Sequence, residues 1–468
     1  IVFLRPAWPP RLLTRKPEFV YDPHWYNNIE YVKDMDRGVP YTEDLWVPGY
    51  FEIPIKKGES IIFSAGTTEA SPRSLNKMYE VELASRTCRT SFYNCLKNAA
   101  KQFYIKDEDG EFIKSGYPWG PIRARDTFIA LPGTTLAINH ENDFHDIMAT
   151  ASKALNNFID NETLDSRIHG IDLPDVPLWA IWSIQQYAKN AGVDKAREKY
   201  LPLAARILDW IIAGGHPNLE VQTSGLVATA GTSVPVSWMN ATSNGWPLIP
   251  RSGLLVEFNA LWYNALMFTY NISEGIKAYE ERREHWGTIA EQAKTAFVDT
   301  FLNDHGYLYD YVNGHYADLS VRPNMAIAIG LDYSPLDRRQ RKGVLDVVTR
   351  ELLTPKGLRT LSPKSYGYQP FYLGSPEERE RAYHNGPARP WLMGSYADAY
   401  IKVFGMSGVS YIDRMLIGFE EEMSNGCIGT ISQLYDGNPP FTGRGAISQA
   451  TNVAEVLRTL RNLKKLNM

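Results

Sequence analysis

The sequence contains few cysteines and lacks any apolar run long enough to cross a bilayer. Its three cysteines are Cys88, Cys95 and Cys427. Cys88 and Cys95 lie on an expected helix about 10 Å apart along its axis, which is too far for a disulfide. An odd count without a favourable pair indicates a reduced, cytoplasmic setting. A membrane span needs about 20 mostly apolar residues, so no membrane partner is expected.

The sequence also lacks an excess of basic residues and the short motifs of common ligand sites. The formal net charge is −4 and the pI is about 6.2, which gives no electrostatic footprint for nucleic acid. There is no P-loop, G-x-G-x-x-G or G-x-S-x-G sequence. The segment HENDFH places His140 and His145 at i, i+5, whereas two zinc-binding histidines on one helix face lie at i, i+4. No metal site is therefore expected.

Charge is missing altogether from residues 221–250, VQTSGLVATAGTSVPVSWMNATSNGWPLIP, although 22% of the chain is charged. This stretch contains Trp238, Asn240, Asn244 and Trp246. Sugars are neutral, with many hydroxyls and apolar C–H faces, so flat aromatic rings and amides suit them. The stretch is predicted to line a sugar-binding cleft, and a buried structural loop is the alternative.

Helical periodicity dominates from about residue 87. Long connections rich in proline, glycine and aromatic residues separate many of the expected helices, and such loops are uncommon unless they are functional. They are 105–125, 214–255, 354–388 and 425–445. Twelve helices with these loops favour a mainly α fold, an (α/α)6 toroid with a cleft at one mouth. A helical solenoid is the alternative, but the sequence has no fixed repeat. The helices are expected at 87–104, 126–138, 143–160, 175–191, 194–213, 256–271, 275–302, 322–329, 335–353, 389–403, 408–424 and 446–462.

The N-terminal residues 1–85 differ from the rest. YFEIPI and SIIFSA flank the turn KKGE at Lys56 to Glu59, which predicts a hairpin. Because two strands are at best marginally stable in water, they are expected to belong to a larger β unit. The chain starts without methionine, which indicates a truncated or processed protein.

The loops carry the candidate chemistry. GYPWGPIRARDTF, residues 116–128, places an adjacent Arg125-Asp126 pair at a helix start, where it can hold two sugar hydroxyls. A helix-capping aspartate beside a surface arginine is the alternative. Asp175 in LPDVPLW also stands at a helix start, where capping is again the alternative.

These segments, in this order, resemble the glucosidase half of glycogen debranching enzymes, the amylo-α-1,6-glucosidases. The resemblance spans about residues 20–463 and includes RDTFIALPG, DVPLW, SWMNA, VEFNALWYNAL, RPNMAIA, GLRTLSP, AYHNG and GTISQLYDGNPPFTGRG. It implies an (α/α)6 toroid over residues 87–468, with the tail of an N-terminal β-sandwich and a linker in residues 1–86. It also implies an inverting glycoside hydrolase that removes α-1,6-linked glucose from branched α-glucan or maltooligosaccharide. Water is the only co-reactant, so no cofactor is implied, and a separate glucanotransferase is a possible partner.

The resemblance also implies which residues bind the glucan. They are Tyr117, Trp119, Arg125, Asp126, Asp175, Trp179, Trp238, Arg359, Tyr383, His384, Trp391 and Asp436. Two positions depart from the family in the expected wall of the cleft. Arg123-Ala124 stands where the family has tryptophan–glycine, and Pro387-Ala388-Arg389 stands where it has threonine–valine–tryptophan. Both tryptophan-to-arginine changes would remodel a sugar-lined mouth.

The two carboxylates that inverting hydrolysis needs are replaced by amides. One carboxylic acid protonates the leaving oxygen and a carboxylate about 6.5–9.5 Å away activates water. The family acid lies in a tryptophan–methionine–aspartate motif, where this chain has Asn240, and the base lies in a serine–glutamate motif, where it has Gln433. An amide keeps the shape of the acid but can neither give nor take a proton in this role.

Three hypotheses follow. The first is an active debranching hydrolase in which another carboxylate acts, with Glu257 and Asp126 as the main candidates besides Asp175 and Asp436. For Glu257 the alternative is a helix cap or an ion pair with Arg251. The second is a catalytically silent glucan-binding relative. The third is a lyase or epimerase on another polysaccharide, which would use Tyr383-His384 and Arg389 around a uronic acid.

Overall fold

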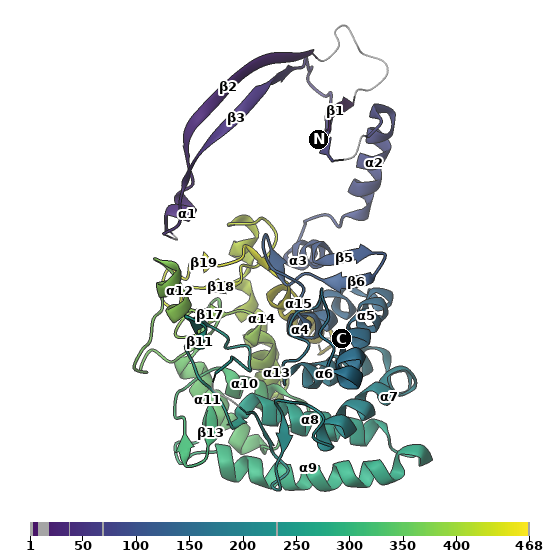
Figure 1. Ribbon diagram of the computed structural model, residues 1–468, viewed down its shortest axis with the longest axis vertical. Helices are drawn as coiled ribbons and strands as arrows, with labels where there is room; N and C mark the ends of the chain where they lie inside the picture. The colour runs from purple at the N-terminus through teal and green to yellow at the C-terminus, as the bar shows by residue number, and fades with distance from the viewer. Residues whose placement is uncertain (1–2, 8–17, 37, 68–69, 231–232, 467–468) are drawn as a thin grey trace. The chain divides into compact units, whose positions relative to one another are not determined.

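The computed structural model describes residues 3–7, 18–36, 38–67, 70–230 and 233–466 (Figure 1). The chain divides into two compact units. The smaller one comprises residues 1–88 and 373–376, and the larger one comprises residues 89–372 and 377–468. The domain boundary between residues 86 and 87 remains a sequence-based prediction.

The described residues of the smaller unit form two antiparallel strand pairs and two helices. Strand β2 (Glu18–Glu30) pairs with β3 (Thr42–Glu52), and β1 (Phe3–Ala7) pairs with β4 (Ile62–Gly66). The helices are α1 (Val32–Asp36) and α2 (Pro72–Ser85).

The predicted hairpin around Lys56 and Glu59 is wrong in its pairing. A tight turn does form there, since the backbone N–H of Glu59 donates to the carbonyl of Lys56 at 3.0 Å. The strands on either side of the turn, β3 and β4, pair with β2 and β1 instead of with each other. Strand β3 is eleven residues long, and β2 offers it a partner of similar length. The five-residue strand β4 could pair with only part of it.

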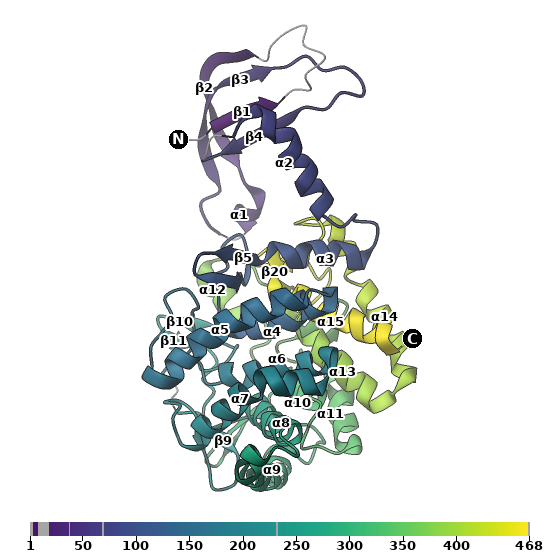
Figure 2. The same ribbon diagram turned by 90° about the vertical axis from the view of Figure 1, so that its right-hand side faces the viewer.

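Among the described residues of the larger unit, twelve helices form two concentric rings (Figures 1 and 2). Each inner helix contacts the next, and the last closes the ring on the first. The inner helices are α4 (Ala124–Thr134), α6 (Val176–Ala191), α8 (Val256–Ile272), α10 (Asn324–Gly330), α13 (Leu392–Phe404) and α15 (Ala450–Leu466). Each outer helix packs on at least one inner helix. The outer helices are α3 (Phe92–Gln102), α5 (Glu141–Asn161), α7 (Val193–Ile212), α9 (Glu280–Phe301), α11 (Arg338–Glu351) and α14 (Met406–Ile417). The predicted (α/α)6 toroid is confirmed.

The position of each helix in the rings follows from its sequence pattern. Outer helix α5 buries a single stripe that includes Phe144, Ile147 and Leu155, as expected for a helix with one solvated face. Inner helix α8 is buried on nearly all sides, because it touches neighbours in both rings. Close contact needs small residues: a Cβ on Gly133 of α4 would lie 1.9 Å from the carbonyl oxygen of Ala454 in α15.

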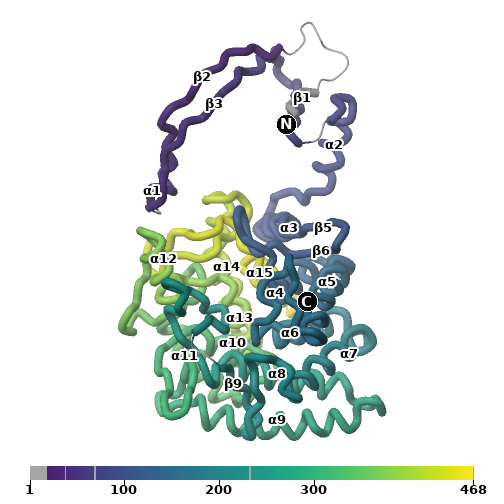
Figure 3. The backbone as a smooth tube through the Cα atoms, in the orientation of Figure 1, coloured from purple at the N-terminus to yellow at the C-terminus, as the bar shows by residue number. Residues whose placement is uncertain are grey.

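The long loops meet at one mouth of the toroid. A five-stranded antiparallel sheet joins two of them. Its strands are β15 (Leu353–Thr354), β16 (Gly357–Arg359), β17 (Ala388–Arg389), β18 (Leu434–Tyr435) and β19 (Gly443–Arg444). The segment before α4 joins them, because β7 (Gly116–Tyr117) pairs with β20 (Ser448–Gln449) at the start of α15. The path of the chain through these segments can be followed on the backbone trace by its colour (Figure 3).

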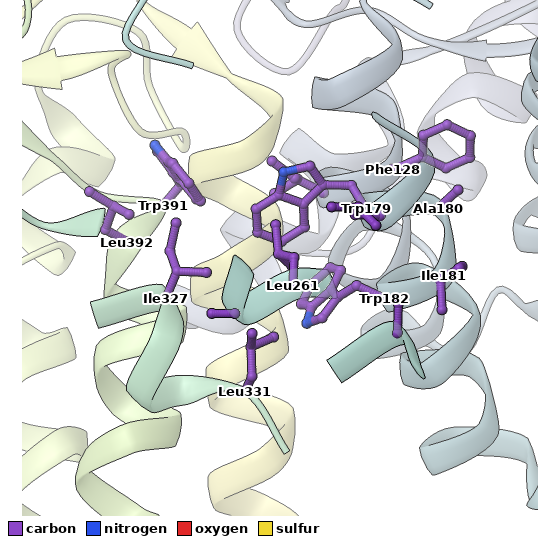
Figure 4. Close-up of a cluster of buried hydrophobic side chains, with 14 of the residues drawn as sticks. Phe128, Trp179, Ala180, Ile181, Trp182, Leu261, Ile327, Leu331, Trp391 and Leu392 are labelled. Carbon is purple, nitrogen blue, oxygen red and sulfur yellow. The ribbon is translucent and has the colours of Figure 1, made fainter. Parts of the chain in front are cut away.

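The interior of the ring below this mouth is filled by large apolar side chains (Figure 4). Trp179 and Trp182 of α6 pack edge to face at 5.4 Å between ring centroids, and Trp179 meets Trp391 at 6.2 Å. Leu261 of α8 and Ile327 of α10 complete the cluster, and both are 1% exposed. The toroid therefore has a packed core with a closed floor under its mouth.

The loop that follows α7 buries His216, which gives a prediction for acid stability. The ring is 3% exposed and lies 5.1 Å from that of Trp210, and burial lowers the pKa of His216 to about 4. Below a pH of about 6.5 the unfolded chain takes up a proton that the folded chain refuses, so stability is complete above that pH and falls as the solution is acidified toward pH 4. At about pH 5 the loss from this group is expected to be about 2 kcal/mol.

Urea denaturation at pH 7 and pH 5 would measure this loss. In His216→Gln the difference between the two pH values should shrink by about that amount. The control is His285→Gln, a change of an exposed histidine on α9. An unchanged pH dependence in His216→Gln would contradict the burial of this ring.

Candidate functional site

A pocket of about 190 Å³ opens at the mouth of the larger unit. This volume is below the range typical of drug-sized ligands, so it favours one small ring over an extended chain. Ten of the residues predicted from sequence line it, namely Arg123, Arg125, Asp126, Trp238, Asn240, Tyr383, His384, Arg389, Trp391 and Gln433. The other lining residues are Ile129, His169, Gly170, Leu173, Gln449, Thr451 and Asn452.

Two consecutive residues, Tyr383 and His384, form hydrogen bonds with Gln433 and Asn240. The backbone N–H of Asn240 donates to Nε2 of His384 at 3.1 Å. The side-chain Nε2 of Gln433 donates to the Tyr383 hydroxyl at 2.6 Å, and its Oε1 accepts from the backbone N–H of Ala446 at 2.9 Å. The loop before α8 and the loop before α15 are thereby brought to one cavity.

His384 is neutral in this arrangement. Its Nε2 accepts a hydrogen bond, so the ring proton lies on Nδ1, which is buried and has no partner in the part of the chain that the structure describes. Burial lowers the pKa of His384 well below its usual range, and the charges of Arg389, Arg322 and other nearby arginines lower it further. A histidine in this state cannot serve as a general acid near neutral pH.

Arg125 and Asp175 form a buried pair beside the pocket. Arg125 donates from Nε and Nη2 to the two carboxylate oxygens of Asp175 at 2.7 and 2.8 Å, and Nε1 of Trp179 donates to the same carboxylate at 3.2 Å. The side chain of Asp175 makes no capping hydrogen bond, although the residue does precede α6. Asp175 and Trp179 thus fix Arg125 and do not themselves line the cavity.

Asp126 contributes the one carboxylate among the described residues that line the pocket. It lies in the first turn of α4 and is half-buried, and its side chain makes no hydrogen bond or ion pair with other described residues. An ionised carboxylate accepts hydrogen bonds only, and its two oxygens can take two hydroxyl donors. Asp126 is therefore available to a ligand.

Glu257 is placed outside the pocket. It is 2% exposed and receives two hydrogen bonds from Arg251, at 2.5 and 2.7 Å. Nε of Arg251 lies 2.7 Å from the carboxylate of Asp310. Burial raises the pKa of Glu257, whereas the charge of Arg251 opposes the shift. The structure thus gives Glu257 the ion pair that was the alternative to a catalytic role.

The remaining predicted residues hold the loops around the pocket. Nε of Arg359 donates to the carbonyl of Gly437 at 2.7 Å. Asp436 accepts from the backbone N–H of Tyr372 at 2.9 Å and from Nε of Arg444 at 3.0 Å. The following two residues also lie outside the lining: Tyr117, whose hydroxyl donates to the carbonyl of Gln102, and Trp119, which is 55% exposed.

The two tryptophans of the lining are anchored in different ways. Trp238 donates from Nε1 to Oδ1 of Asn324 at 2.7 Å, and its ring meets those of His384 and Trp391 edge to face, at 5.2 and 5.4 Å. The backbone N–H of Trp391 donates to Oδ1 of Asn452 at 3.0 Å. Both rings are thus held in place before any ligand binds.

Sequence reasoning missed one side of the pocket. His169, Gly170 and Leu173 come from the connection between α5 and α6, which is shorter than the four long loops singled out from the sequence. Asn452 lies inside a helix predicted from its apolar face, yet its Nδ2 donates to the carbonyls of Ser432 and Gln433 at 2.6 and 3.0 Å. No helical periodicity indicates such a contact.

Two features are absent from the residues that the structure describes. None of their helices combines the length and the apolar character that a bilayer crossing requires. Within the same residues, no group of three or more histidine, cysteine, aspartate or glutamate side chains is arranged to hold a metal ion.

Comparison with known protein families gives two matches. Residues 98–458 match the family described as Amylo-alpha-1,6-glucosidase, and residues 2–62 match the family described as Glycogen debranching enzyme N terminal. The glycogen debranching enzyme of Saccharomyces cerevisiae is 24% identical over 237 residues, which cover 41% of this chain. That match spans only 15% of the yeast protein.

Solved structures from Thermus thermophilus share the fold. An uncharacterized conserved protein has a TM-score of 0.53 at 14% identity, with 77% of this chain and 98% of that chain covered. A GH63 mannosylglycerate hydrolase in complex with Tris and D-glycerate has a TM-score of 0.51 at 12% identity, with 79% of this chain and 99% of that chain covered. At these identities the similarity concerns the toroid alone.

Proposed function

The chain belongs to the amylo-alpha-1,6-glucosidase family, and on that premise we propose that its pocket binds the terminal α-1,6-linked glucose of a branched α-glucan. The observation that carries the proposal is Asp126, a carboxylate without a protein partner in a pocket about the size of one sugar ring. Its two oxygens accept from two neighbouring hydroxyls, as expected for a terminal glucosyl residue.

The other lining groups suit the same ligand. Trp238 and Trp391 offer preformed apolar surfaces for the C–H faces of a sugar. Tyr383, Gln449 and Thr451 add hydroxyl and amide groups that both donate and accept. Little rearrangement is needed on binding, which favours affinity because fewer side chains lose freedom.

The residues of the pocket support hydrolysis less well than they support sugar binding. General acid–base catalysis contributes about 10²–10⁴-fold per group, and Asn240 and Gln433 can supply neither role. Gln433 donates to Tyr383 where a carboxylate could only accept. We therefore propose that the chain has kept glucan recognition and that its turnover is slow.

Hydrolysis by Asp126 is the second candidate function. It is favoured by one observation, that Asp126 is the carboxylate of the described pocket lining. A lyase or epimerase that uses Tyr383, His384 and Arg389 also remains a prediction; these three residues all line the pocket. A cytoplasmic setting and a separate glucanotransferase that shortens branches upstream are part of the proposal.

Substitution of Asp126 tests the binding role. In Asp126→Asn the affinity for a singly α-1,6-branched maltooligosaccharide, measured by titration calorimetry, is expected to fall about tenfold or more, because hydrogen bonds to charged groups are the stronger ones. The matched control is Asp194→Asn, whose side chain is 95% exposed on α7. Equal affinity in Asp126→Asn and the unmodified chain would overturn the proposal.

A further inference from the structure

Two arginines of the pocket wall have no carboxylate partner. Arg389 is 5% exposed; its Nη2 donates to the carbonyl of Tyr383 at 3.0 Å and its guanidinium lies 4.0 Å from the centre of the Tyr383 ring. Its Nε is buried and has no hydrogen-bond partner among the described residues. Arg123, on the exposed rim, makes no side-chain hydrogen bond or ion pair with any described residue. Both side chains line the pocket.

Three other buried arginines of the larger unit have a carboxylate partner. Arg125, Arg251 and Arg458 each donate two hydrogen bonds to a single carboxylate. Arg322, which does not line the pocket, donates to the carbonyls of Thr360 and His384 and to Oδ1 of Asn385. Burying a guanidinium is costly unless a counter-charge and hydrogen bonds compensate. Arg389 is therefore a guanidinium of the pocket lining whose charge no carboxylate among the described residues offsets.

The charge of the lining points to the same conclusion. Arg125 is neutralised by Asp175 from below, which leaves Arg123 and Arg389 against the single carboxylate of Asp126. No ion pair joins Asp126 to either arginine in the described structure. A neutral sugar would leave the charge of the Arg389 guanidinium without a counter-charge, whereas an anionic oxygen would supply one.

We infer that this pocket takes a sugar that carries an anionic group, a phosphate or a carboxylate. The anionic oxygens accept from Arg389 and Arg123, and Asp126 accepts from ring hydroxyls. Arginine suits this role because its planar donors match both oxyanions. The inference rests on the proposed function for the recognition of the sugar, and it narrows the substrate class to a charged derivative.

Titration calorimetry with four probes tests the inference: glucose, glucose 6-phosphate, glucuronate and inorganic phosphate. At least one charged sugar is expected to bind about tenfold or more tightly than both glucose and inorganic phosphate. A preference for glucose 6-phosphate identifies a phosphate as the group, and a preference for glucuronate identifies a carboxylate. Glucose that binds as tightly as both charged sugars would overturn the inference, and so would inorganic phosphate that binds as tightly as they do.

A branched maltooligosaccharide, titrated in parallel, separates this inference from the proposed function. If the neutral glucan binds and the charged sugars bind no more tightly than glucose, only the inference fails. If a charged sugar binds and the neutral glucan does not, only the proposed glucan recognition fails.

Two substitutions test whether Arg123 and Arg389 bind the anionic group of the sugar. In Arg123→Met the affinity for the preferred charged sugar is expected to fall about tenfold more than the affinity for glucose, because only the charged sugar loses an ionic hydrogen bond. Arg389→Lys keeps a charge but loses the planar donors, so it is expected to reduce the same preference. The control is Arg350→Met, whose side chain is 60% exposed outside the pocket. An unchanged preference in both pocket variants would contradict the inference.

Discussion

Replacing Asn240 by aspartate together with Gln433 by glutamate is expected to raise glucose release from a singly α-1,6-branched maltooligosaccharide by about 10⁴-fold or more. The double variant restores a group that can protonate the leaving oxygen and a group that can activate water. The surroundings of Gln433 accept the change, because Ala446 N–H and the Tyr383 hydroxyl both can donate to a glutamate. Direct inversion would release β-glucose, so the anomer should be followed by NMR.

The single variants and one outside change serve as controls. Each of Asn240→Asp and Gln433→Glu alone should recover much less than the pair, because groups that act as a unit are not additive. Gln292→Glu, on the exposed side of α9, should have no effect. Rapid release of glucose by the unmodified chain would contradict the proposal of slow turnover and direct attention to Asp126.

The second large effect is expected in the buried charge cluster beneath the loop of residues 233–250. Arg251→Met should lower the free energy of unfolding by about 3–5 kcal/mol, because it leaves the carboxylates of Glu257 and Asp310 buried without a counter-charge. Their side chains are 2% and 1% exposed. Urea denaturation measures the loss.

An exposed ion pair gives the matched control. Arg206 pairs with Asp160 on the outer helices, and both side chains are about half exposed. Arg206→Met is expected to cost at most about 1 kcal/mol. A similar small loss in Arg251→Met would contradict the cluster as described.

Substitution of Glu257 distinguishes a structural role of this residue from a catalytic one. Combined with the restored pair at positions 240 and 433, Glu257→Gln should weaken the fold, since one charge of the cluster is lost. It should leave glucose release per folded molecule unchanged, because Glu257 does not line the pocket. A large loss of turnover would return Glu257 to the catalytic candidates.

The candidate site could be predicted only in part. Arg125, Asp126, Asn240 and Gln433 were recognisable because they stand in motifs that resemble a known family. Arg389 was recognisable only as a departure from that family, and its missing partner became visible when its surroundings were known. His169 and Asn452 were missed, because neither the connection between α5 and α6 nor the start of α15 carries a pattern that marks them as pocket residues.

The sequence by itself determined the helices and the ring they form. Apolar periodicity is a local property, so the twelve helices were predicted close to their observed positions, and loop length indicated which connections build the mouth. The sequence also showed that the expected acid and base positions cannot exchange protons, since Asn240 and Gln433 are amides whatever the fold.

Only the tertiary structure decided which groups meet. Strand β3 overlaps the predicted strand YFEIPI only at residues 50–52, and it pairs with β2, because pairing depends on contacts between distant segments. Asp175 was read as a helix cap or a sugar ligand and proved to hold Arg125, fifty residues away along the chain. Glu257 pairs with Arg251 inside the protein, whereas Asp126 faces the pocket without a partner. Whether a carboxylate is neutralised or available depends on the charges that folding brings within a few ångströms, and sequence spacing does not contain that distance.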